Sequence, residues 1–193
     1  MITLAAVRRA LRGHWGVPAV APDARPAAVA LALVEGEHGA EILLIRRAVR
    51  AGDPWSGQVA LPGGRREPAD RDLLATAIRE TREETGIDLR RGEPLAVLDD
   101  LAPVTPVLPP VVVRPFVFAL SRRPALRPND EVQDGFWVPL DRLAEPGLRR
   151  EVTVTVRGGE RTLPAYVVGE HVIWGMTERI LTPFLELVMG SHA

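Results

Sequence analysis

The sequence contains no cysteine, and all 24 of its Lys and Arg residues are arginine. The first absence excludes a disulfide scaffold, a thiolate metal site and a cysteine nucleophile. Without lysine, neither Schiff-base chemistry nor a P-loop phosphate site is available. No apolar run approaches the roughly 20 residues that a membrane-spanning helix needs.

The overall composition is that of an ordinary globular protein. With 193 residues, 46% hydrophobic and 25% charged, we expect a single domain over 1–193, with residues 1–26 forming a helix and a linker packed on it. A net charge of -1 gives no reason to expect a nucleic acid or an anionic membrane as partner. The start "MITLAAVRRALRGHWG" predicts a short amphipathic helix, not a signal peptide, so a cytoplasmic location is expected. The oligomeric state, monomer or homodimer, stays open.

Hydrophobic periodicity predicts an α/β (α+β) fold with about seven strands and two main helices. Gly86 is well placed just after the first main helix, and Pro115 suggests that its strand is an edge strand or has a bulge. The expected elements are a hairpin near 27–48, a short strand within 56–62, a helix over 72–85, strands within 93–102, 111–120 and 135–140, a hairpin over 151–168 and a final helix over 174–190.

The stretch "RETREETG" places Glu80, Glu83 and Glu84 at helical spacings i, i+3 and i+4. Like charges at this spacing repel, and the negative end of the helix dipole makes the repulsion worse. One interpretation is a solvated helix face balanced by Arg79 and Arg82. The other is a cation site, because the three carboxylates share one flank of the helix and can converge on one point.

A glycine-rich loop, "LPGGRREP", lies directly upstream. Glycine lets the backbone approach a ligand closely, and arginines such as Arg65 can bind phosphate. Mg²⁺ or Mn²⁺ prefers hard oxygen ligands, including carboxylates and phosphate oxygens. The acids and the loop together therefore suggest metal-assisted attack of water on a phosphate linkage.

The segment "GGRREPADRDLLATAIRETREETGI" resembles a Nudix box, with the pattern G-x5-E-x7-R-E-U-x-E-E-x-G-U, where U is aliphatic. The second half matches at every position from Arg79 to Ile87 except Thr81, which stands where an aliphatic residue is usual. In the first half, Asp70 replaces the glutamate, and eight residues instead of seven separate it from Arg79.

The resemblance implies a Nudix fold, a mixed sheet between helices with the box as loop–helix–loop. It implies Glu83 and Glu84 as principal metal ligands and Glu80 as a further ligand or as the group that activates water. The resemblance also implies that the carbonyl of Gly64 completes the metal shell and that Arg79 orients the carboxylates by ion pairing. For Arg79, a simple i,i+4 pair with Glu83 is the alternative.

Upstream, "LLIRRA" and "GQVALPGG" resemble the coenzyme A diphosphatase branch of this family, with Ile45 and Leu61 departing from its pattern. The extra residue in the box is also a feature of that branch. The resemblance implies Mg²⁺- or Mn²⁺-dependent cleavage of coenzyme A into phosphopantetheine and 3′,5′-ADP. The same reaction on ADP-ribose, NADH or dinucleoside polyphosphates is the near alternative. A catalytically silent nucleotide-binding module is the alternative of another class.

Arg46, Arg47 and Arg50 are candidates for binding substrate phosphates, and surface arginines at a strand end are the competing interpretation. Glu131 is a candidate extra carboxylate from a distal loop.

Two other stretches have equally open roles. Either "PVTPVLPP" lines the pocket for the non-nucleotide moiety or it is a stiff connector. Trp55 either stacks on an adenine or packs on the domain. His171 and Trp174 are expected to be structural residues at the start of the last helix.

Overall fold

The computed structural model of the chain describes residues 1–50, 56–102, 110–156 and 159–190. Trp55 and most of "PVTPVLPP" lie outside these ranges, so their proposed roles stay predictions. In chain order the elements are α1 (Leu4–Ala10), β1 (Arg25–Gly36), β2 (Gly39–Arg47), β3 (Val59–Ala60), β4 (Gly63–Arg65), α2 (Leu73–Thr85), the 3-10 helix η1 (Leu89–Arg91), β5 (Glu93–Val97), β6 (Val111–Ala119), β7 (Val132–Pro139), α3 (Leu140–Leu143), β8 (Arg149–Val156), β9 (Gly159–Val168), β10 (His171–Trp174) and α4 (Met176–Gly190).

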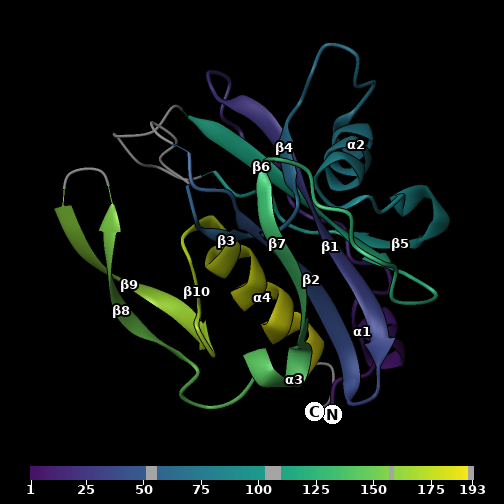
Figure 1. The fold of residues 1–193 in the computed structure, drawn as a ribbon. Helices are drawn as coiled ribbons and strands as arrows, with labels where there is room; N and C mark the ends of the chain where they lie inside the picture. The colour runs from purple at the N-terminus through teal and green to yellow at the C-terminus, as the bar shows by residue number, and fades with distance from the viewer. Residues whose placement is uncertain (51–55, 103–109, 157–158, 191–193) are drawn as a thin grey trace.

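The larger sheet is mixed. Its strand order is β3-β2-β1-β6-β5, with β4 also paired to β1 and β7 to β2. β1 and β6 run parallel through its centre, with Leu31 opposite Val117, whereas the other pairs are antiparallel. This mixed α+β arrangement (Figure 1) confirms the predicted fold class.

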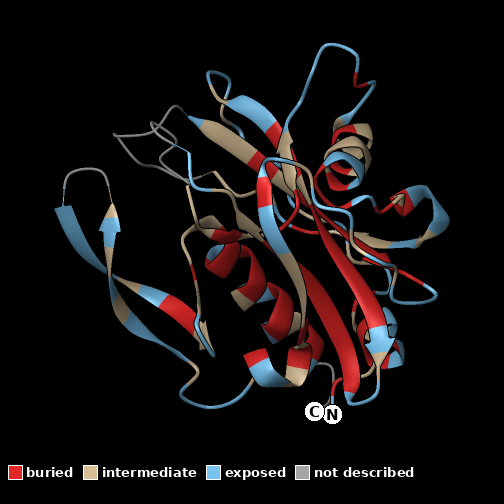
Figure 2. Ribbon diagram, in the orientation of Figure 1, coloured by how far each residue is buried: buried red, intermediate tan, exposed pale blue. Residues whose placement is uncertain are grey.

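The two faces of this sheet bury different side chains. In β1, Leu31 and Leu33 join the core beneath α4, whereas Ala30 and Ala32 join the core beneath α2. Successive side chains of a strand point to opposite faces, which explains this alternation. The small alanines let α2 lie close to the sheet. Figure 2 shows the buried residues concentrated in the central strands and in the inner side of α4.

A second sheet, in the order β10-β9-β8, lies beside the first (Figure 1). It is attached to α4 by the Arg149 Nε–Glu178 Oε1 ion pair at 2.8 Å and by the hydroxyl contact between Tyr166 and Thr182, also 2.8 Å. The prediction for residues 171–174 was wrong in type, because they form β10 and the helix begins only at Met176. The run "HVIW" is too short for its period to distinguish strand from helix.

The expectation that Pro115 marks an edge or bulge of its own strand was also wrong. β6 pairs on both sides, with β1 and β5, although proline cannot donate a hydrogen bond to the sheet. On the β5 side the register ends with Val97 opposite Phe116, so the paired residues stop one position before Pro115. Beyond it, the Leu98 N–H donates to the Pro115 carbonyl at 3.0 Å.

The N-terminal segment lies along the larger sheet and α4. The Thr3 side chain caps α1 by accepting from the Ala6 N–H at 3.2 Å, and the Gly16 N–H donates to the Val97 carbonyl at 2.9 Å. No helix in the described part of the chain has both the length and the apolar character needed to cross a membrane.

Candidate functional site

The helix α2 holds the acidic cluster in place. It begins where the Asp72 carboxylate accepts from the Ala75 N–H at 2.7 Å, an N-cap. It ends at Gly86, whose φ of 77° is left-handed, as predicted for its C-cap. Because Ala77 and Thr81 are buried against the sheet, the helix cannot rotate its carboxylates away from the neighbouring glycine loop.

That loop approaches the central strand more closely than any side chain allows. Gly63 has a φ of +152°, and a Cβ there would lie 2.2 Å from the Ala28 carbonyl oxygen. β4 pairs with β1 at this point, with Val29 opposite Gly63. The Gly63 N–H is thereby directed at Glu84 and donates to its Oε2 at 2.8 Å.

Among the three glutamates of the α2 cluster, Glu84 and Glu80 are the two that the fold removes from water. The Glu84 side chain is 2% exposed and that of Glu80 is 15% exposed. Burial raises the pKa of Glu84 to about 8; the charges of Glu80 and Glu131 add to that rise, and Gly63 and Arg47 oppose it. Burial also raises the pKa of Glu80, against the opposing effect of Arg79. Both groups are therefore costly to ionise.

Arg79 connects the two halves of the predicted box. Its guanidinium donates to both Asp70 oxygens at 3.0 Å, to Glu80 at 3.0 Å and to Glu83 at 3.1 Å. It also donates to the Arg65 carbonyl at 3.1 Å. The Arg79 hydrogen bonds hold the pKa of Asp70 well below its usual range.

Asp70 is a site residue that the sequence pattern marks only as a departure from the box. Its side chain is 5% exposed and also accepts from the Thr76 hydroxyl at 2.9 Å and the Glu67 N–H at 2.9 Å. The signal was its place at the acidic position of the first half of the box. The structure shows why an acid there is useful, since it anchors the arginine that lies between Glu80 and Glu83.

The structure brings only part of the predicted ligand set together. Glu80 and Glu84 face Gly64 and Gly63, whereas the Glu83 side chain is 53% exposed and binds Arg79. Among the described residues, no three Asp, Glu or His side chains are grouped so as to hold a metal ion. The donors nevertheless suit a hard dication, because two buried carboxylates with raised pKa values gain most from a nearby positive charge.

The β2 arginines lie at this end of the sheet but have different partners. Arg47 Nη1 lies 4.0 Å from Glu84 Oε1. Arg46 Nη2 lies 2.9 Å from His171 Nδ1, and that imidazole stacks on Phe136 with ring centroids 3.9 Å apart. Arg46 is thus placed on the face of β2 opposite to Arg47.

Two further predicted residues, Arg50 and Glu131, form a pair. Their side chains approach to 3.2 Å, between Arg50 Nη1 and Glu131 Oε1. The Arg65 side chain is exposed beside the loop, and its backbone serves Arg79.

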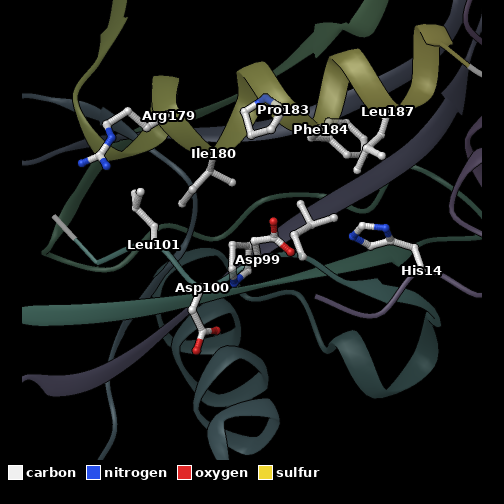
Figure 3. Close-up of a pocket in the computed structure, with 11 residues that line it drawn as sticks. His14, Asp99, Asp100, Leu101, Arg179, Ile180, Pro183, Phe184 and Leu187 are labelled. Atoms are coloured by element: carbon white, nitrogen blue, oxygen red, sulfur yellow. The ribbon is translucent and has the colours of Figure 1, made fainter. Parts of the chain in front are cut away.

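A cavity of about 190 Å³ lies elsewhere. It is bounded by α4, by His14 of the N-terminal segment and by residues 98–101, which follow β5. Figure 3 shows His14 and Asp99 on one side of it and Pro183 and Phe184 of α4 on the other. None of the predicted site residues lines this cavity. Because it is on the α4 face, it is separate from the acids of α2.

Comparison with known proteins places this geometry in a family. The NUDIX domain model matches residues 24–156. The human mitochondrial coenzyme A diphosphatase NUDT8 is 33% identical over 189 residues, which cover 94% of this chain and 76% of the human protein. The uncharacterized protein C14C4.10c of Schizosaccharomyces pombe is 36% identical over 132 residues, 65% of this chain. The match spans 40% of that longer protein.

A MutT/nudix family protein from Enterococcus faecalis has the same fold, with a TM-score of 0.56, 20% identity and coverage of 97% of this chain and 75% of that one. The chain therefore belongs to the NUDIX domain family. Within that family it is an enzyme, a Nudix hydrolase of the pyrophosphatase type.

Proposed function

We propose that this enzyme uses Mg²⁺ or Mn²⁺ to cleave the diphosphate linkage of a nucleoside diphosphate derivative, with coenzyme A as substrate and 3′,5′-ADP and phosphopantetheine as products. The observation that carries the proposal is the Glu84 carboxylate, buried beside Glu80 and Gly63 with its pKa raised to about 8. The Gly63 N–H and Arg47 favour the charged form of Glu84 but do not offset its burial, so a ligand that stabilises that charged form explains the buried acid best.

Each residue of the site has a task in this proposal. Glu84 and Glu80 would hold the cation with the Gly64 carbonyl, and Glu83 would join them after exchanging one contact with Arg79. A bound dication would neutralise charge on the diphosphate and acidify water. Arg79, anchored by Asp70, keeps the carboxylates from rotating away. Glu80 is either a further ligand of the cation or the group that accepts the proton of the attacking water, and the Arg79 contact at 3.0 Å orients it.

Coenzyme A as the substrate is supported by the sequence around the site. "LLIRRA" forms the end of β2 and contains Arg47, which lies 4.0 Å from Glu84. "GQVALPGG" ends with Gly63 and Gly64, the first residues of β4. Both segments that resemble the coenzyme A diphosphatase branch thus border the acids. The human relative bears the name of a coenzyme A diphosphatase. ADP-ribose, NADH and dinucleoside polyphosphates are the alternative substrates, and a cytoplasmic location remains a prediction.

A substrate panel tests this proposal. Coenzyme A, ADP-ribose, NADH and a diadenosine polyphosphate are each incubated with the enzyme and Mg²⁺ or Mn²⁺, and the products are separated by chromatography. We expect the highest kcat/KM for coenzyme A. Higher kcat/KM for ADP-ribose would refute the substrate, and no turnover of any member would favour a silent nucleotide-binding module.

A further inference from the structure

The pair formed by Arg50 and Glu131 joins two residues for which the sequence suggested separate tasks. Arg50 follows the end of β2, and Glu131 precedes the start of β7. The Arg50 guanidinium donates to Glu131 Oε1 at 3.2 Å and to the Asp130 carbonyl at 3.0 Å. A forked contact to a side chain and to the backbone beside it fixes the carboxylate in one direction.

The backbone places this pair next to the acid cluster. The Ala48 N–H donates to the Glu131 carbonyl at 2.8 Å, and Arg47 lies opposite Val132 in the β2–β7 register. Arg47 in turn reaches Glu84. The charge of Glu131 is felt by both Glu80 and Glu84, where it helps to raise their pKa values. Glu131 is therefore an acid at the border of the site, held back by an arginine.

The ion pair between Arg50 and Glu131 is weak enough for a ligand to break it. Both side chains are 49% exposed, and ion pairs in such positions contribute little to stability. The Arg50 guanidinium uses two of its five N–H groups on Glu131 and Asp130. A phosphate is a stronger bidentate partner for guanidinium than a half-solvated carboxylate whose neighbours are also acids.

We propose that Arg50 is a positioning residue that holds Glu131 at the border of the acid cluster until a phosphate group of the substrate binds the guanidinium and releases the carboxylate toward the cation. The inference rests on the proposed function. It predicts that substrate binding and cation binding strengthen one another through these two side chains, since coupling of this kind is reciprocal.

A double-mutant cycle of Arg50→Gln and Glu131→Gln tests it, first by Mn²⁺ affinity measured by electron paramagnetic resonance without substrate. Because Arg50 holds Glu131 back when no substrate is bound, Glu131→Gln should weaken Mn²⁺ binding less than about twofold in the wild-type background and about threefold or more in the Arg50→Gln background. Arg50→Gln should tighten it about threefold in the wild-type background, because Glu131 is freed, and change it less than about twofold in the Glu131→Gln background. Equal effects of Arg50→Gln in both backgrounds would overturn the inference.

Steady-state kinetics give the second readout. Because Glu131 competes with substrate for Arg50, Glu131→Gln should lower both KM and kcat, whereas Arg50→Gln should raise KM. In the Arg50→Gln background, the effect of Glu131→Gln on KM should disappear, and an undiminished effect would contradict the inference. Arg50→Lys keeps the positive charge but not the bidentate guanidinium, so its KM should lie between those of wild type and Arg50→Gln. A KM equal to that of Arg50→Gln would also contradict the inference.

The matched control is the exposed ion pair between Arg8 and Glu93, whose side chains lie 2.9 Å apart. Neither residue is near Arg50 or Glu131 in the sequence. Arg8→Gln and Glu93→Gln should leave Mn²⁺ affinity and KM unchanged. The Mn²⁺ measurements need no turnover, so they test the role of Arg50 even if the substrate panel refutes coenzyme A. Failure of the cycle in an enzyme that cleaves coenzyme A would refute only the inference.

Discussion

At the scale of single residues, Glu84 is a carboxylate whose burial opposes its ionisation. Its carboxylate accepts a hydrogen bond from Gly63 and lies 4.0 Å from Arg47, but burial and the charges of Glu80 and Glu131 outweigh both. In the absence of a cation, burial favours its protonated form at neutral pH. Such a carboxylate favours the binding of a cation, because the cation stabilises the charged form that burial disfavours.

Glu84 should make the metal-free protein less stable as the pH rises. Its folded pKa lies above the unfolded value, so its contribution to stability is full below about pH 4.5 and is lost as the pH rises toward about 8. The shift corresponds to at most ~5 kcal/mol. In EDTA, the melting temperature of Glu84→Gln should equal that of wild type at pH 5 and exceed it at pH 9. Glu37→Gln, on an exposed turn, is the control; a Glu84→Gln curve parallel to wild type would contradict this prediction.

Asp70 should make the protein less stable as the pH falls, the opposite of the effect expected for Glu84. Its pKa is depressed by Arg79, so its contribution is present above about pH 4, its unfolded value, and is lost as the pH falls below it. Asp70→Asn leaves Arg79 without its buried partner and should cost about 3 kcal/mol in urea unfolding at pH 7. It should also lower kcat about tenfold. The exposed Asp23→Asn removes the same charge and should do neither; an Asp70 variant as stable as wild type would argue against the anchoring role.

At the scale of elements, the site is a helix end set against a tight loop. α2 and its left-handed glycine were predictable because a 13-residue segment contains enough turns for its period to be read, and Gly86 is the residue type that such an end requires. The contact of α2 with the loop depends on β4 pairing with β1 near Ala28, a long-range pairing that no local pattern encodes. The Asp70–Arg79 contact, in contrast, is local, because the two residues are nine positions apart.

Gly63→Ala should therefore damage the site and the fold together. The new Cβ meets the backbone of β1, which cannot move aside, and the φ of +152° is unfavourable for alanine. We expect a loss of about 3 kcal/mol or more in the free energy of unfolding. Gly147 has a φ of +82°, and a Cβ there would meet no atom of the described residues within 4 Å, so Gly147→Ala should cost only about 1 kcal/mol. Equal losses would show that the close approach to β1 is unimportant.

At the scale of the whole molecule, the mixed sheet separates two regions. The acids, the glycine loop and the end of β2 meet on the α2 side, whereas α4 and the second sheet cover the other side. The reaction type could be inferred from sequence because the acids, Arg79 and Gly63–Gly64 lie within one short segment. The assembly of distant residues could not, since Arg50 and Glu131 are 81 positions apart and meet only through the pairing of β2 with β7.

Cation binding should release protons. At pH 7 the Glu84 carboxyl is largely protonated in the metal-free protein, because its pKa is about 8, and a dication requires the charged form. Calorimetry of Mn²⁺ binding in buffers of different ionisation enthalpy should therefore detect release of close to one proton at pH 7 and of fewer at pH 9. Glu84→Gln should abolish that release, and its persistence in the variant would assign the proton to another group.

The most direct test of the central claim is the turnover of coenzyme A by wild type and Glu84→Gln at saturating Mg²⁺ or Mn²⁺. Products are quantified by chromatography, and circular dichroism confirms that both proteins are folded. If the buried acid cluster is a cation site for diphosphate hydrolysis, EDTA abolishes the wild-type reaction and Glu84→Gln lowers kcat by about a thousandfold. Turnover that persists in EDTA, or a variant within about threefold of wild type, would contradict it.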